Sequence, residues 1–189
     1  MVGKILGKVG MFFLETVQAI VLALSIFIIV YLFLFQPHRV SGRSMYTAFD
    51  DGEFLLTNKL SYRLGSPERG DIVVFKAPKT EPCSEIECEY IKRIIGLPGE
   101  AIKVSNGHYY INGIKLEENY LGTDVYTNDG TYLPESVEKI LPDGYFFVSG
   151  DNRPYSRDSR EFGPVPYPSI VGKAWFRYWP VNKMGLIKH

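Results

Sequence analysis

Three short stretches of the chain carry side chains that could act as nucleophiles, acids or bases. Residues 41–45 contain Ser44, residues 90–100 place Lys92 in an apolar run, and residues 150–160 combine hydroxyl groups with charges of both signs. A serine hydroxyl is a weak nucleophile unless a neighbouring base takes its proton. The first question is therefore which residue could serve as that base.

The histidines are poorly placed for this role. His38 follows a long apolar run, His108 follows a predicted turn, and His189 is the last residue. A Ser-His-Asp triad or a zinc cluster needs a well-placed imidazole, so neither is expected, and no metal or cofactor is required. Cys83 and Cys88 are too few for a four-ligand zinc site, and both a small-loop disulfide and two free thiols remain open.

Lys92 is the most informative position. In a strand, Lys92 and Arg93 lie on opposite faces, so one of these two cations should point inward. A lone lysine in a strand more commonly extends to solvent. At its ordinary pKa only about one lysine in 2,500 is neutral at pH 7, so a general base would require burial that lowers the pKa. A neutral amine beside a serine could then take the hydroxyl proton.

An apolar segment precedes all three stretches. Residues 16–35 carry no charge, and 20 helical residues span about 30 Å, the thickness of a bilayer core. Lys4 and Lys8, opposed only by Glu15, place residues 1–15 in the cytosol by the positive-inside rule. A cleaved signal peptide and a buried helix of a soluble protein are the alternative interpretations. We expect a single-pass protein of the plasma membrane, with residues 36–189 outside the cytoplasm.

The charge balance excludes one class of partner. The chain has 21 basic and 21 acidic residues, so its formal net charge is zero. There is no basic surplus to neutralise phosphates, and a nucleic-acid partner is not expected.

The outer part, residues 36–189, is predicted to be mainly β, with antiparallel sheets. Short β-type runs alternate with glycine and proline. The predicted strands are Phe54–Leu60, Ile72–Lys76, Tyr90–Ile95, Ile102–Ser105, His108–Ile111, Tyr145–Ser149 and Val171–Tyr178. Asn106-Gly107 and Asn112-Gly113 suit hairpin turns that require positive φ, and residues 117–144 are predicted to be a long connection with at most one strand.

Together the three stretches resemble the bacterial type I signal peptidases, which use a Ser/Lys dyad, in their short Gram-positive form. The family pattern Gly-x-Ser-Met-x-Pro-Thr-Leu reads here Gly42-Arg43-Ser44-Met45-Tyr46-Thr47-Ala48-Phe49. The later motifs read Arg69-Gly70-Asp71-Ile72-Val73-Val74-Phe75, then Lys92-Arg93 with Gly96-Leu97-Pro98-Gly99, then Gly150-Asp151-Asn152-Arg153 with Ser156, Asp158, Ser159 and Arg160. Their order and the apolar segment also agree, so the resemblance spans nearly the whole chain.

The resemblance implies a role for each matching residue. Ser44 would be the nucleophile, Lys92 its general base, and Ser156 the hydroxyl that orients the amine. The supporting ion pairs would come from Asp151, Arg93, Asp158 and Arg160. Shallow pockets for small substrate residues would be lined by Val40, Met45, Phe49 and Ile91.

Two features depart from the family pattern. Thr47, Ala48 and Phe49 replace Pro-Thr-Leu, which removes a fixed φ after the nucleophile. Gly42 stands where better-studied members have a serine, so the backbone N–H of Ser44 is the one oxyanion donor that can be assigned.

We expect a membrane-anchored serine endopeptidase that cleaves signal peptides from exported preproteins, with the lipid bilayer as its second partner. A self-cleaving Ser-Lys protease of the repressor type would carry a DNA-binding module in place of the apolar segment. Two further interpretations are a catalytically weak or silent anchored β-domain that binds exported polypeptides, and an adhesin that uses Arg69-Gly70-Asp71. The aromatic run at 175–180 suits either the lipid headgroup zone or an ordinary core strand.

Overall fold

The computed structural model describes residues 2–82, 88–122 and 125–188, and the chain divides into two compact units, residues 1–36 and 37–189. Whether the two cysteines are joined depends on Cys83, which lies outside the described residues.

The first unit is one helix, α1 (Val2–Phe33), 32 residues long. Its apolar part is Gly10–Tyr31, 22 residues with a mean hydropathy of 2.4. This stretch starts earlier than the predicted residues 16–35 and includes the single charge of Glu15. It also ends earlier, at Tyr31, and the helix is followed by strand β1 (Phe35–Arg39). The helix is long and apolar enough to cross a bilayer.

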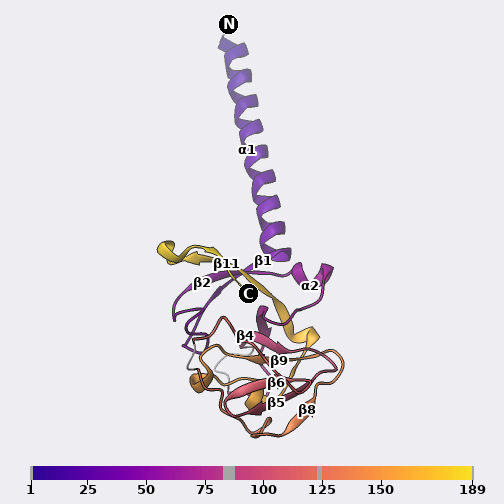
Figure 1. The fold of residues 1–189 in the computed structure, drawn as a ribbon. Coiled ribbons are helices and arrows are strands. Elements are labelled where there is room, and N and C mark those ends of the chain that lie inside the picture. Colours follow the sequence, from indigo (N-terminus) through magenta and orange to yellow (C-terminus); the bar gives the residue numbers. More distant parts are fainter. Residues whose placement is uncertain (1, 83–87, 123–124, 189) are drawn as a thin grey trace. The chain divides into compact units, whose positions relative to one another are not determined.

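The described part of the second unit forms two mainly antiparallel sheets (Figure 1). The large sheet has the order β1, β2 (Phe54–Asn58), β11 (Ile170–Trp179), β3 (Ile72–Lys76), β4 (Glu89–Gly96), β9 (Tyr145–Ser149) and β10 (Val165–Pro166), with β12 (Gly185–Leu186) also paired to β11. The small sheet has the order β7 (Ile114–Lys115), β6 (His108–Ile111), β5 (Ala101–Ser105) and β8 (Glu138–Ile140). Short helices lie in the connections between strands: α2 (Ser61–Leu64), η1 (Arg153–Tyr155), α3 (Ser159–Phe162), η2 (Tyr167–Ser169) and η3 (Val181–Lys183).

The mainly β prediction is confirmed, and all seven predicted strands are present. Three have the predicted bounds, and the other four differ by one or two residues at their ends. Asn106 and Gly107 take φ values of 49° and 77° between paired strands β5 and β6, as the predicted hairpin requires. The connection 117–144 contains one described strand, β8. Five strands were not assigned from the sequence. Strands β7, β8, β10 and β12 are two or three residues long, too short for a clear period-2 pattern, and the five-residue β1 contains Pro37, which weakens the strand signal.

Strand β4 is covered on both faces, and this decides the environment of its two cations. Along β4, Lys92 lies opposite Val73 of β3, and Arg93 lies opposite Ile72 of β3 and Ser149 of β9. Lys92 is 4% exposed and Arg93 is 2% exposed. The sequence predicted that one of these two side chains would point inward. Both are buried, because apolar residues pack against each side of the sheet.

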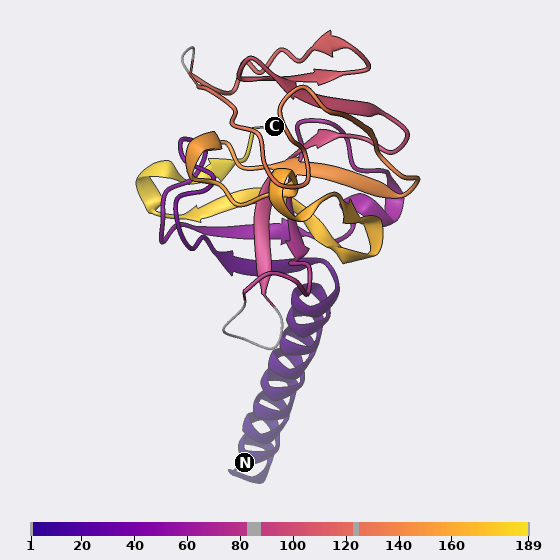
Figure 2. The ribbon, with the colours of Figure 1, turned by 90° about the horizontal axis from the view of Figure 1, so that it is seen from below.

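The small sheet has its own apolar cluster, to which the large sheet contributes Ile95 and Phe147. Figures 1 and 2 show β5 and β6 side by side at one end of this unit, away from β2 and β11. In the aromatic run, Trp175 is 39% and Trp179 is 52% exposed, whereas Ala174 just before it is buried. These two tryptophans are therefore surface residues of the strand.

Candidate active site

Ser44 lies in a turn between β1 and β2 that is held by the backbone on each side. The N–H of Val40 donates to Glu53 O at 2.8 Å, and the N–H of Phe49 donates to Met45 O at 2.9 Å. Gly42 has a φ of 85° and donates its N–H to Asp51 Oδ1 at 2.8 Å. A positive φ is readily adopted only by glycine, so Gly42 lets the chain fold back just before the serine.

The amine of Lys92 meets the hydroxyl of Ser44. Lys92 Nζ donates to Ser44 Oγ at 2.7 Å and to Ile91 O at 3.1 Å. Burial lowers the pKa of Lys92 to about 8, against the opposing charges of Asp158 and Asp151, which raise it. Desolvation disfavours the ammonium form because a charge loses its hydration in the protein interior.

The turn after β9 holds Ser44 from the other side. The N–H of Asn152 donates to Ser44 O at 3.0 Å, and the Asn152 side-chain amide donates to Arg43 O at 2.9 Å. A Cβ on Gly150 would overlap both the Ser156 hydroxyl and the Ser44 carbonyl oxygen. The glycine therefore allows this close approach, although the sequence motifs assigned no role to Gly150 or Asn152.

Ser156 does not make the hydrogen bond to the Lys92 amine that the resemblance implies. Its hydroxyl is buried beside Gly150, and it makes no hydrogen bond of ordinary geometry with a described residue. The hydrogen bonds of the Lys92 amine go to Ser44 and Ile91 instead.

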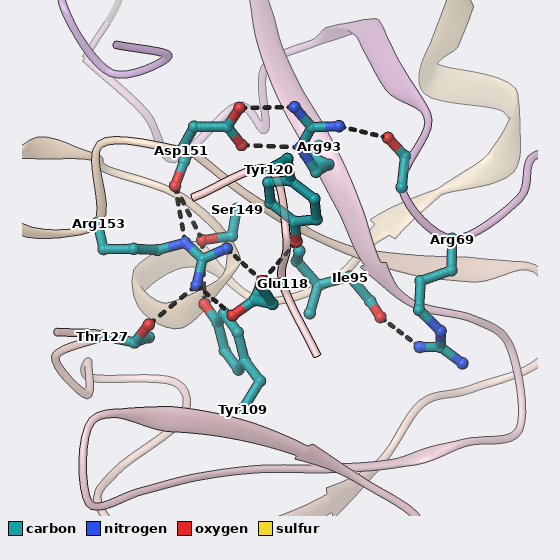
Figure 3. A network of polar contacts seen from close by, with 12 residues as sticks. Arg69, Arg93, Ile95, Tyr109, Glu118, Tyr120, Thr127, Ser149, Asp151 and Arg153 are labelled. Carbon is teal, nitrogen blue, oxygen red and sulfur yellow. Dashed lines mark hydrogen bonds and ion pairs between the residues drawn. The ribbon is translucent and has the colours of Figure 1, made fainter. Parts of the chain in front are cut away.

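Both expected ion pairs are present around the site. Arg93 makes a two-bond contact with Asp151, Nε to Oδ1 at 2.9 Å and Nη2 to Oδ2 at 2.7 Å (Figure 3). Asp158 accepts from Arg160 Nε at 2.8 Å and from the N–H of Gly150 at 3.0 Å. Burial alone would raise the pKa of Asp158, but the hydrogen bonds from Arg160 and Gly150 and the Arg160 charge hold it below its usual range.

A cleft of about 340 Å³ adjoins Ser44. Of the residues expected to line substrate pockets, Val40 and Ile91 form part of its wall. Met45 and Phe49 are each 1% exposed and lie in the apolar cluster that contains Val40, so they support the wall without being among the residues that line the cleft.

Ionisable residues that the sequence motifs did not single out also line this cleft. His38 Nε2 lies 2.7 Å from Glu89 Oε2, and His38 Nδ1 lies 2.9 Å from Thr57 Oγ1. The hydrogen bond with His38 lowers the pKa of Glu89. Arg157, in the same wall, pairs with buried Glu81. These pairs come from segments distant in sequence, and no local pattern indicated them.

Residues 47–49, which replace Pro-Thr-Leu of the family pattern, are contacted by a side chain from strand β11. Arg177 Nη2 donates to Ala48 O at 2.7 Å, and its guanidinium lies 4.8 Å from the centre of the Phe49 ring. Arg177 also pairs with Glu53 at 3.1 Å. These contacts restrain the turn after Ser44 although Thr47 replaces the family proline.

The Arg69-Gly70-Asp71 tripeptide is not displayed for a partner. Asp71 is 4% exposed and accepts from Tyr62 Oη at 2.8 Å and from Lys173 Nζ at 2.5 Å. The adhesin interpretation is wrong, since the carboxylate it needs is buried and bonded within the fold.

The described part of the chain contains no cluster of three or more His, Cys, Asp or Glu side chains that could hold a metal ion.

The site brings together a buried amine, a serine hydroxyl and a cleft. This arrangement is typical of serine peptidases that use lysine in place of histidine.

The matching family model and the curated relatives agree with this class. Residues 13–179 match the family model described as signal peptidase, peptidase S26. Signal peptidase IB of Staphylococcus aureus is 36% identical over 181 residues, covering 90% of this chain and 91% of that protein. Signal peptidase I of Bacillus caldolyticus is 42% identical over 159 residues, covering 80% and 84%. The crystal structure of a signal peptidase I from Enterococcus faecalis V583 is 31% identical, with a TM-score of 0.46, and covers 58% of this chain and 97% of that one.

The chain belongs to the signal peptidase family, peptidase S26. It is accordingly a serine endopeptidase.

Proposed function

We propose that this protein is a membrane-anchored signal peptidase that removes N-terminal signal peptides from exported preproteins by a Ser44/Lys92 dyad. The observation that carries the proposal is the 2.7 Å contact between a buried amine and a serine hydroxyl at the edge of a cleft. With a pKa of about 8, roughly one-tenth of the amine is neutral at pH 7.

The reaction follows from this geometry. Neutral Lys92 takes the proton of Ser44 Oγ as the oxygen attacks the scissile carbonyl carbon, and the N–H of Ser44 donates to the developing oxyanion. The ammonium then gives its proton to the leaving amine as the C–N bond breaks, which leaves the signal peptide as an ester on Ser44. Lys92 next takes a proton from water as the water oxygen attacks the ester carbonyl. The bond from Ser44 Oγ to that carbonyl carbon then breaks, the signal peptide leaves with a new carboxyl end, and the Lys92 ammonium returns the proton to Ser44 Oγ.

The substrate side of the proposal uses the cleft. Val40 and Ile91 line it beside Ser44 and offer small apolar contacts to the residues before the cut. A preprotein is also held in the bilayer by its own apolar segment, which raises its local concentration near a tethered peptidase without strong contacts at the cleft.

Replacing Ser44 or Lys92 tests the dyad. Ser44→Ala and Lys92→Ala should each lower cleavage of a purified preprotein by at least about 1,000-fold, since each removes a reacting group. Product is followed by gel shift, and circular dichroism checks that both variants fold. Cleavage near the wild-type rate by either folded variant would refute the assignment.

We also propose that α1 spans the plasma membrane once, with residues 1–9 in the cytosol and residues 37–189 outside. Lys4 and Lys8 flank the apolar stretch Gly10–Tyr31 on its N-terminal side. Protease added to intact cells stripped of their wall should digest the outer unit, while a tag at the N-terminus should be cut only after lysis. Protection of the outer unit in intact cells would reverse the proposed orientation.

A further inference from the structure

The segment that follows strand β7 of the small sheet contacts two buried arginines behind the active site. Residues 116–122 leave β7, and the N–H of Leu116 donates to Tyr109 O of β6 at 2.8 Å. In Figure 3, Tyr120 of this segment lies next to Arg93, and Glu118 lies next to the guanidinium of Arg153. Neither residue belongs to the motifs found in the sequence.

Glu118 supplies the negative charge that Arg153 requires. The Arg153 side chain is fully buried, and its Nη1 and Nη2 donate to the two Glu118 carboxylate oxygens at 2.9 and 2.5 Å. Among the described residues, Glu118 is the carboxylate with which Arg153 forms an ion pair. Because a guanidinium stays charged in proteins, loss of this partner leaves an uncompensated buried charge.

Tyr120 links the same segment to the strand that carries the lysine. Its hydroxyl donates to Glu118 Oε1 at 2.5 Å, and its ring centre lies 3.9 Å from Cζ of Arg93. Arg93 is the chain neighbour of Lys92 and the partner of Asp151. The segment therefore contacts both arginines at once.

These arginines connect directly to the turn that holds the serine. Arg153 Nε donates to Gly150 O at 3.0 Å, and Arg93 binds Asp151 in the same turn. Asn152, between them, donates its N–H to Ser44 O. Two fixed arginines thus anchor a four-residue turn whose middle part sets the position of the serine backbone.

We propose that Glu118 and Tyr120 form a brace that positions the 150–153 turn and, through it, Ser44 relative to Lys92. The brace touches neither the reacting atoms nor the cleft, so its two members are positioning residues. This inference rests on the proposed dyad, since it concerns the alignment of Ser44 with its base. It assigns the small sheet a part in catalysis, because the brace is anchored on that sheet.

The test separates alignment from stability. In the full-length protein in detergent micelles, Glu118→Gln and Tyr120→Leu should lower kcat by about 10- to 100-fold, the cost of a small misplacement of a reacting group. KM should stay within about twofold, because the cleft wall is unchanged. Tyr120→Phe keeps the ring over Arg93 and should retain more activity than Tyr120→Leu.

Glu100→Gln is the matched control. Glu100 also pairs with an arginine, Arg69, at 2.5 Å, and its other oxygen accepts from the N–H of Leu97 at 2.7 Å. In the described structure neither Arg69 nor Glu100 bonds to the 150–153 turn, Ser44 or Lys92. This variant should lower the melting temperature while keeping the wild-type kcat.

Equal kcat values for the brace variants and Glu100→Gln, at comparable folded fractions, would overturn the proposal. If Glu118→Gln does not fold, Tyr120→Leu decides the matter, because it leaves the Glu118–Arg153 pair intact. Failure of the dyad itself is a different result: the Ser44→Ala protein would then cleave the preprotein as well as the wild type.

Discussion

The two cations of strand β4, one on each face, differ in their bonding partners. Lys92 and Arg93 are chain neighbours and are buried to nearly the same extent. Arg93 has a two-bond partner in Asp151 and donates to Gly70 O. Lys92 bonds a serine hydroxyl and a carbonyl oxygen, and it forms no ion pair with a described carboxylate.

The difference shows that a buried cation can have a structural or a catalytic role, depending on whether it has a carboxylate partner. A buried guanidinium with a carboxylate partner keeps its charge and holds its neighbours in place. A buried amine without one has its pKa lowered, and Asp158 and Asp151 only partly oppose this effect. The paired face thus supports the turn around Gly150, while the unpaired face retains a base that can be neutral near physiological pH.

Replacing each cation by methionine should change stability in opposite directions. Arg93→Met leaves Asp151 buried without its partner and should lower the free energy of unfolding by about 3–5 kcal/mol. Lys92→Met removes a buried amine and should raise that free energy at pH 7 by up to about 3 kcal/mol, from a pKa lowered from 10.5 to about 8. Urea denaturation of both variants measures the two values.

The pH dependence of that gain provides its control. Between pH 8 and 10.5 the unfolded chain still holds the Lys92 proton while the folded chain has lost it, so the wild type gains stability as the pH rises. The advantage of Lys92→Met should therefore shrink over this range. A destabilised Lys92→Met protein at pH 7 would contradict the contrast between the two faces.

The pH dependence of wild-type activity should reflect the titration of the Lys92 amine. Since Lys92 must be neutral to act, kcat/KM should rise about tenfold per pH unit below pH 8 and level off above it. The measurement is preprotein cleavage from pH 5 to 10, with circular dichroism at each pH to check the fold. A limb that is still rising at pH 10 would mean that the amine is solvated.

Parts of this molecule follow from local pattern. The apolar stretch in α1, the seven predicted strands and the Asn106-Gly107 hairpin depend on residues close together in the chain. Short edge strands such as β10 and β12 have too few residues for a period and form only because a neighbouring strand is already in place.

Only part of the active site could be predicted from local sequence patterns. Short, ordered motifs were enough to identify Ser44 and Lys92 as candidates, together with the ion pairs around them. Only the folded chain shows that Lys92 and Arg93 are both buried and that Ser156 does not bond the amine. The same is true of the contacts by which Arg177, Glu118 and Tyr120 reach residues around the site. Burial and charge pairing depend on which strands pack against β4, and Ser44 and Lys92, 48 positions apart, meet only in the folded chain.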